Sequence, residues 1–436
     1  MTLTVRLERA VEAARPRVTG RVQRIVGLNL EVAGIEAAIG DAVLVEAPGQ
    51  PDDVLVAEVV ALHDDGAVCM PFGDLRGVRG GSQVEATGRP MTIHVGHGLL
   101  GRVVDGLGRP IDGGPPLLGV EEVTVDGTPP HPLRRQRVER HLPLGVRAID
   151  TLIPCGAGQR MGIFAGSGVG KSSLLSMIAR GTTADVSVLA LVGERGREVR
   201  EFIEGDLGAE GLARSVVVVS TSDEPALVRL RAAFTATRIA EWFRDQHRDV
   251  VLMMDSLTRF AMAQREVGLS AGEPPATRGY PPSVFALLPR LLERAGQAEH
   301  GSITGLYTVL VEGDDMNEPI GDAARSILDG HIVLSRRLAT AGHFPSIDVL
   351  ESVSRVTGSV TTPDQRAAIT ELRSLMAAYR DAKDLVEIGA YVTGTNPMVD
   401  RALQLHDATD AFLRQPIHDV ADAATSWAAL HGLVGS

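Results

Sequence analysis

The stretch MGIFAGSGVGKSSLLSMIAR, residues 161–180, decides the fold of this chain. It opens with MGIFA, an apolar run typical of a buried strand, and it closes with LLSMIAR, which has a helical composition. Between them, AGSGVGKSS (165–173) follows the pattern of a phosphate-binding loop. In such a loop glycines let backbone N–H groups turn toward phosphate oxygens, and the following helix adds a positive dipole. The stretch therefore predicts a nucleoside triphosphate site on a strand, loop and helix.

Each residue of this loop has an expected place in the site. Lys171 should reach the β- and γ-phosphates, and Ser172 should give its hydroxyl to Mg²⁺. The motif normally opens with glycine, so Ala165 fits only if its φ is negative. The residues expected to bind the nucleotide are Ala165, Gly166, Ser167, Gly168, Val169, Gly170, Lys171, Ser172 and Ser173.

Two carboxylates follow other apolar runs. Asp255 ends VVLMMD (250–255), and in P-loop enzymes such an aspartate joins the magnesium shell through water. Glu194 follows a strand expected at about 187–192, and the carboxyl ends of parallel strands face the ligand. It could polarise the attacking water as a general base. The alternative is that Glu194 has no catalytic role and is simply an acidic residue at the start of the next helix, where the helix dipole favours a negative charge.

Three parts with different patterns follow one another. Residues 17–90 hold short β-type runs separated by Gly, Pro and Asp, which predicts a small all-β barrel or sandwich. These runs are RVQRIV, LNLEVAG, DAVLVEA, VLVAEVVAL and GAVCMPF. Residues 91–362 alternate β-rich runs with helical stretches, which predicts a parallel sheet covered on both faces. The β-rich runs are MGIFA, SVLALVG, SVVVVS, VVLMMD and ITGLYTVLV. Residues 363–436 turn to amphipathic helix, and residues 1–16 could form a short helix that frays or docks a partner. The expected fold class is α/β, with a β-barrel before the core and a helical domain after it.

Composition limits the classes of function. The 436 residues are 44% hydrophobic and carry a net charge of −12, which argues against nucleic acid as a partner. Lysine occurs only at Lys171 and Lys383. Cys69 and Cys155 are too few for a disulfide framework and lack metal-ligand spacing, so both are expected in or near the core. With no membrane-spanning run and no secretory signal at the start, a cytoplasmic location is the default.

Five longer stretches of the chain stand out beside the phosphate-binding loop. They are GRVVDGLGRPIDG (101–113), GERGREVREFIE (193–204), DSLTRFAMAQRE (255–266), RGYPPSVFALLPRLLERAG (278–296) and VLVEGDDMNEPIGDAARSILDGHIVLSR (309–336). Together they resemble the catalytic subunits of rotary ATP synthases and type III secretion ATPases, and the resemblance spans about residues 17–415. Within that family, the run of residues 309–336 is similar to the flagellum-specific export ATPases rather than to those of virulence injectisomes.

The resemblance implies a RecA-like ATPase core and roles that spacing alone does not give. Glu194 matches the catalytic glutamate of the family, Arg195 an arginine near the terminal phosphate, and Arg259 another arginine close to the site. Arg355, in SVSRV, aligns with a finger arginine that reaches the neighbouring subunit's site. Phe344 falls where the synthase β-subunit places a ring on adenine. On the residues alone, Arg355 could be a surface salt-bridge arginine and Phe344 a core side chain.

The function implied is ATP hydrolysis, with Mg²⁺ as cofactor, that drives chaperone release and export of flagellar subunits. The implied partners are other copies of the chain in a homohexamer, export regulator and stalk proteins, membrane proteins of the export gate, and chaperone–substrate complexes, but no nucleic acid. The implied location is cytoplasmic, at the inner-membrane export apparatus, with peripheral association through partners. The loop expected at 266–282 could face the central channel, or be an ordinary solvent loop.

Three alternatives stay open. An injectisome ATPase shares the same motifs. A rotary synthase subunit is disfavoured because this one chain carries both the catalytic glutamate and the finger arginine. A hexamer built from copies of such a chain would need no second type of subunit. An RNA-translocating hexamer of the Rho kind is disfavoured by residues 17–90, where six arginines face eleven acidic residues and Phe72 is the sole aromatic.

Overall fold

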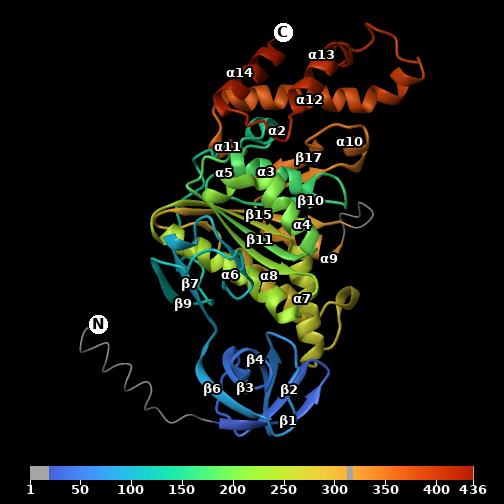
Figure 1. Cartoon of the computed structure of the whole chain (residues 1–436). Coiled ribbons are helices and arrows are strands. Elements are labelled where there is room, and N and C mark those ends of the chain that lie inside the picture. The colour runs from blue at the N-terminus through green and yellow to red at the C-terminus, as the bar shows by residue number, and fades with distance from the viewer. Residues whose placement is uncertain (1–18, 312–317, 436) are drawn as a thin grey trace.

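The computed structural model describes residues 19–311 and 318–435 (Figure 1). It has a small barrel at one end, a large sheet covered by helices in the middle, and a helical unit at the other end (Figure 1). The possible partner-binding helix in residues 1–16 lies outside the described residues. Among the helices that are described, none has the length and apolar character needed to cross a bilayer.

A closed barrel of six strands opens the described chain, so the prediction of a barrel rather than a sandwich is the correct one. The order around it is β1-β2-β5-β4-β3-β6. Five strands coincide with the β-type runs of the sequence, whereas β6, QVEATGRP, has no apolar run and was not predicted. It closes the barrel by pairing with both β1 and β3. The strands are β1 (Thr19–Val26), β2 (Asn29–Ala33), β3 (Asp41–Glu46), β4 (Val54–His63), β5 (Gly66–Pro71) and β6 (Gln83–Pro90).

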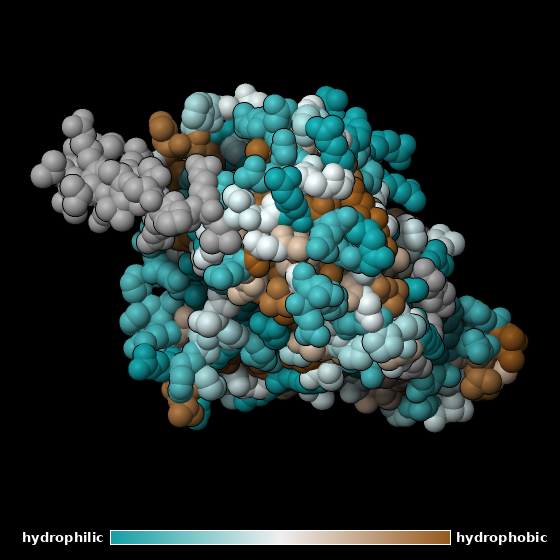
Figure 2. Space-filling view, turned by 90° about the horizontal axis from the view of Figure 1, so that it is seen from below, coloured by the Kyte–Doolittle hydropathy of each residue, from teal (hydrophilic) through white to brown (hydrophobic). Residues whose placement is uncertain are grey.

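Seen from the barrel end, the surface is mostly hydrophilic, with separate apolar patches (Figure 2). The exposed aliphatic side chains of the barrel include Ile25, Val26, Leu28, Ile39 and Leu62. Exposed aliphatic residues are common on soluble proteins and define no site by themselves.

A buried ion pair fastens the barrel to the middle of the molecule. Arg231 of α6 (Ala226–Asp245) donates its Nε to Glu58 of β4 at 2.7 Å, and the two side chains are 11% and 7% exposed. Burial raises the pKa of Glu58 more than the guanidinium lowers it. At a second point, the Asn29 side chain donates to the carbonyl of Ser270, where α7 (Leu257–Ser270) ends. The barrel is therefore held against both helices.

The middle of the chain forms a nine-stranded sheet within the described residues, with main order β17-β16-β10-β15-β13-β11-β12-β8. Strands β10, β11, β12, β13 and β15 coincide with the apolar runs of the sequence and are parallel. The edge strand β17 is antiparallel to β16, which the sequence did not predict. The strands are β8 (Val103–Asp105), β10 (Arg160–Ala165), β11 (Val186–Glu194), β12 (Ser215–Thr221), β13 (Asp249–Asp255), β14 (Gly296–Gln297), β15 (Ser302–Leu310), β16 (Gly330–Leu334) and β17 (Ile347–Ser354).

Alternation along the strands divides the core into two layers, as a sheet covered on both faces requires. In β11, Val188 and Ala190 pack with the layer of α6 and α7, whereas Leu189 and Leu191 pack with the layer of α3 (Lys171–Gly181). The prediction of helices on both faces is confirmed (Figure 1). The remaining elements of this part are β7 (Thr92–Gly96), β9 (Val120–Thr124), α2 (Arg147–Leu152), α4 (Gly196–Glu201), α5 (Gly208–Ala213), α8 (Pro282–Leu292), α9 (Pro319–Ile327), α10 (Arg336–Thr340) and α11 (Thr357–Val360).

One side chain satisfies the irregular part of β17, residues 349–352, where the pairing with β16 is interrupted. The guanidinium of Arg373 donates to the carbonyls of Val349, Leu350 and Ser352 at 2.7, 3.4 and 3.2 Å. Burial lowers the pKa of Arg373. Backbone carbonyls that lack a strand partner are therefore satisfied from α12 (Pro363–Glu387).

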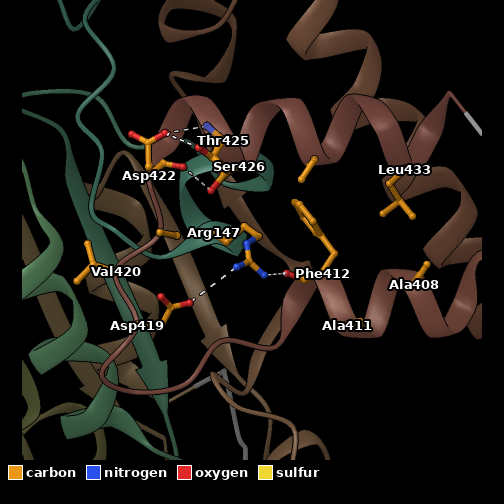
Figure 3. Close-up of a pocket in the computed structure, with 12 residues that line it drawn as sticks. Arg147, Ala408, Ala411, Phe412, Asp419, Val420, Asp422, Thr425, Ser426 and Leu433 are labelled. Carbon is orange, nitrogen blue, oxygen red and sulfur yellow. Dashed lines mark hydrogen bonds and ion pairs between the residues drawn. The ribbon is translucent and has the colours of Figure 1, made fainter.

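The C-terminal helical unit begins with a capping box. The Thr362 hydroxyl accepts from the Gln365 backbone, and the Gln365 side chain accepts from the Thr362 backbone, which fixes the start of α12 at Pro363. Helices α13 (Pro397–Leu413) and α14 (Ala423–Val434) complete the unit. A cavity of 710 Å³ lies where α13 and α14 meet Arg147 of α2, whose guanidinium donates to the Phe412 carbonyl (Figure 3).

Two further expectations can be compared with the structure. Cys69 and Cys155 are free and fully buried, as predicted. The loop expected at 266–282 is shorter, because α7 continues to Ser270 and α8 begins at Pro282. The helical period of α7 runs on through Val267 and Gly268, which are buried, and this places the loop at 271–281.

Candidate active site

The phosphate-binding loop lies at the carboxyl end of β10. The strand ends at Ala165, whose carbonyl accepts from the Val311 N–H, and α3 begins at Lys171. Gly168 and Gly170 have φ of +75° and +92°, left-handed values that glycine adopts without steric cost. The φ of Ala165 is not positive, so alanine is acceptable where the motif normally has glycine.

Neighbouring elements hold the loop from outside. The Ser346 hydroxyl donates to the Val169 carbonyl at 2.6 Å, and the Arg336 guanidinium donates to the Ser167 carbonyl at 3.2 Å. These two hydrogen bonds fix the carbonyls of Ser167 and Val169 on the outer side of the loop. Gly166 and Val169 are buried, Ser167, Gly168 and Ser172 are exposed, and Gly170, Lys171 and Ser173 lie between these limits.

The two predicted carboxylates meet at Lys171. Its Nζ lies 2.5 Å from Oδ1 of Asp255 and 3.4 Å from Oε1 of Glu194. Asp255 is the last residue of β13 and Glu194 the last of β11, so the carboxyl ends of parallel strands bring them together as expected. The strand extends to Glu194, beyond the predicted end near 192, and α4 begins only at Gly196. The carboxylate of Glu194 thus lies beside Lys171 and precedes that helix.

Burial and mutual charge shift the pKa values in this cluster. Burial lowers the pKa of Lys171, but Asp255 and Glu194 outweigh it, so that the pKa is raised and the lysine stays charged. Burial and the charge of Asp255 raise the pKa of Glu194 against the opposing effect of Lys171. A carboxyl with a raised pKa next to a phosphate site is suited to accept a proton.

Two of the three arginines assigned by resemblance, Arg259 and Arg195, differ in their surroundings. Arg259 packs over Gly193, and its buried Nε has no hydrogen-bond partner. Its charge lowers the pKa of Glu194, so it lies close to the cluster. Arg195 is exposed, and its guanidinium lies 3.3 Å from Glu198. Arg259 therefore presents an unsatisfied donor at the site, whereas Arg195 points to solvent at its edge.

Phe344 lies beside the phosphate-binding loop. Its ring is 47% exposed, so it is not a core side chain, and it lies 3.5 Å from where a Cβ on Gly170 would be. It lines a cavity of 480 Å³ together with Ser173 and Met177 of α3 and the segment 414–417 after α13. An exposed ring at the mouth of an apolar cavity next to the phosphate loop is suited to stack on a base.

Arg355 lies away from this cluster. Its backbone N–H donates to the Asp329 carbonyl, and the Asp329 carboxylate accepts from Arg160 at the beginning of β10. The phosphate loop follows the other end of the same strand, a distance of about 20 Å for six residues. Arg355 is exposed, and its guanidinium donates to the Arg325 carbonyl at 3.2 Å. It does not join the site of its own chain.

Sequence reasoning missed three residues around the site. Arg336 contacts the loop, and Gln415 donates its N–H to the Phe344 carbonyl at 3.0 Å. Thr308 of β15 donates its hydroxyl to Oδ1 of Asp255 at 2.8 Å. Thr308 is one of two threonines in the mostly apolar run ITGLYTVLV, which was a usable signal, whereas nothing local marks the other two residues.

The residues present suit a magnesium nucleotide. Ser172, next to Lys171 in the chain, offers a hydroxyl, Asp255 offers a carboxylate in contact with Lys171, and the Nε of Arg259 is an unpaired donor. No cluster of three or more His, Cys, Asp or Glu side chains within the described ranges could hold a metal ion. That agrees with Mg²⁺ sites built from one or two protein groups plus substrate phosphates.

The fold and the site define a P-loop nucleoside triphosphatase whose core lies between a β-barrel and a helical domain. Three family models match in that order: the β-barrel domain of the ATP synthase alpha/beta family at residues 22–88, its nucleotide-binding domain at 145–354, and the C-terminal domain of the type III secretion ATPase EscN at 361–432. The chain belongs to the ATP synthase alpha/beta family, in the branch of flagellar and type III secretion ATPases, and is an ATP hydrolase.

Individual relatives align with this chain over nearly its whole length. The flagellum-specific ATP synthase of Bacillus subtilis is 53% identical and the alignment covers 96% of this chain and 95% of that protein. The type 3 secretion system ATPase of Xanthomonas euvesicatoria is 51% identical over 91% and 90%. The assembled ATPase EscN of enteropathogenic E. coli superposes with a TM-score of 0.89 at 46% identity, over 95% of this chain and 100% of EscN. The fold class predicted from the sequence is confirmed.

Proposed function

We propose that the chain is the ATPase of a flagellar type III protein export apparatus and that hydrolysis drives chaperone release and export of flagellar subunits. The observation that carries the proposal is the Lys171, Glu194 and Asp255 cluster on a chain 53% identical to a flagellum-specific ATP synthase. The 51% identity to a type 3 secretion system ATPase keeps an injectisome ATPase as the second candidate.

Binding begins when the phosphates of ATP draw Lys171 away from its two carboxylates. The loop N–H groups and Lys171 bind the β- and γ-phosphates, and the ring of Phe344 stacks on adenine. Ser172 would hold Mg²⁺ directly and Asp255 through water. The metal, when bound, supplies charge neutralisation of the phosphate oxygens.

Hydrolysis needs a base and positive charge at the terminal phosphate. Glu194, released from Lys171, accepts a proton from the attacking water, which its raised pKa favours. The unpaired Nε of Arg259 supplies a hydrogen-bond donor on the same side. Arg195, at the exposed edge, can turn toward the terminal phosphate from the start of α4.

The finger arginine must act on another subunit. Arg355 lies at the opposite end of β10 from the site of its own chain, so it can serve only a neighbouring copy. We therefore infer a homohexamer with Arg355 of one subunit at the γ-phosphate of the next, an arrangement supported by the assembled state of EscN. Such an arginine contributes about 10³-fold or more to turnover in related NTPases.

Mixing two inactive variants tests this arrangement. Arg355→Ala and Glu194→Gln should each be nearly inactive, the second by about 10²-fold or more. Mixed under conditions that allow exchange, they form some interfaces with both groups intact, and activity should reappear and rise with protein concentration. Normal turnover of Arg355→Ala, or full activity of a dilute monomer, would contradict the finger in trans.

Deletion of the gene distinguishes the two export systems. Cells without the chain should lose flagellar filaments and secreted flagellar subunits, and the wild-type gene but not Lys171→Ala should restore them. Intact filaments with loss of injectisome secretion would assign the chain to the second candidate. Affinity purification from the same cells should recover the proposed stalk, regulator, gate and chaperone partners at the cytoplasmic face of the inner membrane.

A further inference from the structure

Thr308 is a fully buried polar residue at the centre of the molecule. It lies on β15, which runs between β10, the strand of the phosphate loop, and β13, the strand that ends at Asp255. Its neighbours Tyr307 and Val309 pack in the layer of α6 and α7, whereas Leu306 packs in the layer of α3. By alternation Thr308 shares the face of Leu306, which is the face of the phosphate site.

The hydroxyl of Thr308 has one proton to donate, and Asp255 is its better acceptor. The distance to Oδ1 of Asp255 is 2.8 Å, against 3.3 Å to the Met254 carbonyl. Oδ1 is also the atom that Lys171 contacts at 2.5 Å. One oxygen of a carboxylate whose side chain is 5% exposed is thus shared by two donors on different elements.

We propose that Thr308 is a positioning residue that holds Asp255 in place when the nucleotide takes Lys171 away. The proposal rests on the assignment of Asp255 to the magnesium shell. Lys171 cannot serve both Asp255 and the phosphates, so on binding Asp255 loses its cation. Thr308 stays, because its backbone pairs with Ile163 of β10 and the residue before it, Tyr307, pairs with Met254 of β13. Its hydrogen bond then directs the carboxylate toward the metal-bound water.

The same strand offers a matched control. Thr304 is also fully buried and lies on the same face, but four residues earlier, about 13 Å along the strand. Its hydroxyl accepts from the Gly158 N–H at 2.8 Å and has no contact with Asp255. Thr304→Val therefore removes a buried hydroxyl from β15 without touching the site.

The test measures how much Mg²⁺ strengthens nucleotide binding. If Thr308 only stabilised the fold, its replacement would not change this gain in affinity. Fluorescent ADP is titrated against the full-length chain with and without Mg²⁺. In Thr308→Val the gain from Mg²⁺ should fall by about 10-fold, the usual weight of a hydrogen bond to a charged group, with Mg²⁺-free binding unchanged. Thr308→Ser, which keeps the hydroxyl, and Thr304→Val should both keep the gain.

A Thr308→Val protein with the full gain would overturn the proposal, provided that Asp255→Asn loses it. If Asp255→Asn also keeps the gain, Asp255 is not in the magnesium shell, and the proposed function loses that residue as well. Should Thr308→Val fold poorly, Thr308→Ser and Thr308→Ala give the same comparison, since they differ only by the hydroxyl. Equal gains in those two variants would likewise overturn it.

Discussion

Replacing Lys171 with alanine should abolish ATP hydrolysis and also destabilise the nucleotide-free protein. The first effect follows from the loss of the charge that bridges the β- and γ-phosphates. The second follows from what remains: Asp255 and Glu194, 5% and 12% exposed, face each other without the cation that lies 2.5 and 3.4 Å from them. In this arrangement Lys171 stabilises the fold in addition to its proposed role in catalysis.

The size of the structural effect follows from the burial of the cluster. Removing one partner of a buried ion pair costs about 3–5 kcal/mol. The lower end applies here, because Glu194 already has a raised pKa and can take up a proton. For a domain of about 150–250 residues, 1 kcal/mol shifts Tm by about 2–4 °C, so we expect a fall of about 6–12 °C. The fall in Tm should be larger at pH 8 than at pH 5. The pKa of Glu194 is raised in the folded protein, so the folded protein loses stability as the pH rises and this carboxyl ionises.

The assay is thermal unfolding of the nucleotide-free protein, beside ATP turnover. Lys383→Ala is the matched control, since it removes the only other lysine, whose pair with Glu387 is exposed and contributes little. The double variant Lys171→Ala with Asp255→Asn should recover part of the lost stability but no activity. An unchanged Tm in Lys171→Ala would refute the ion-pair reasoning, and near-normal turnover would refute the phosphate site itself.

Three further outcomes are expected. Turnover should fall as the pH is lowered through the raised pKa of Glu194, at a pH above the ordinary value of 4.5, because the protonated carboxyl cannot accept a proton; a profile that stays flat to pH 4.5 would exclude it as the base. Phe344→Ala should raise KM for ATP by about 10-fold with little change in kcat, while Phe344→Tyr stays near wild type; equal KM values would remove the ring from adenine binding. Arg231→Leu should cost about 3 kcal/mol in urea unfolding by leaving Glu58 buried without its cation, and Glu58→Leu in the same chain should restore most of it. No loss in the single variant would show that this pair does not hold the barrel.

The parts of the fold that could be predicted are those that a short continuous stretch of sequence determines. The strand, loop and helix around Lys171 and the apolar run ending in Asp255 are continuous in sequence, so spacing alone located them. The rule that ligands bind at the carboxyl ends of parallel strands then placed Glu194 beside them. The strand β6 escaped prediction because its pairing with β1 and β3, and not its own apolarity, makes it a strand.

Contacts that depend on the folded chain could not be read in advance. Whether Phe344 was buried or exposed depended on the cavity formed with the segment after α13, some seventy residues later. The place of Arg355, at the far end of β10 from the site, depended on the antiparallel course of β17. Thr308 could be noticed in the sequence as a polar residue in a strand, but its hydrogen-bond acceptor, Asp255, is 53 residues away in the chain.

The guanidinium of Arg373 bears on how the protein avoids aggregation. An open sheet ends in strands whose free carbonyls and N–H groups can recruit a strand from another molecule. At the edge strand β17, Arg373 takes three acceptors out of use, the carbonyls of Val349, Leu350 and Ser352, and places a charge beside them. Since α12 carries this arginine, we expect a chain whose C-terminal helices have not yet docked to leave these acceptors open to other molecules.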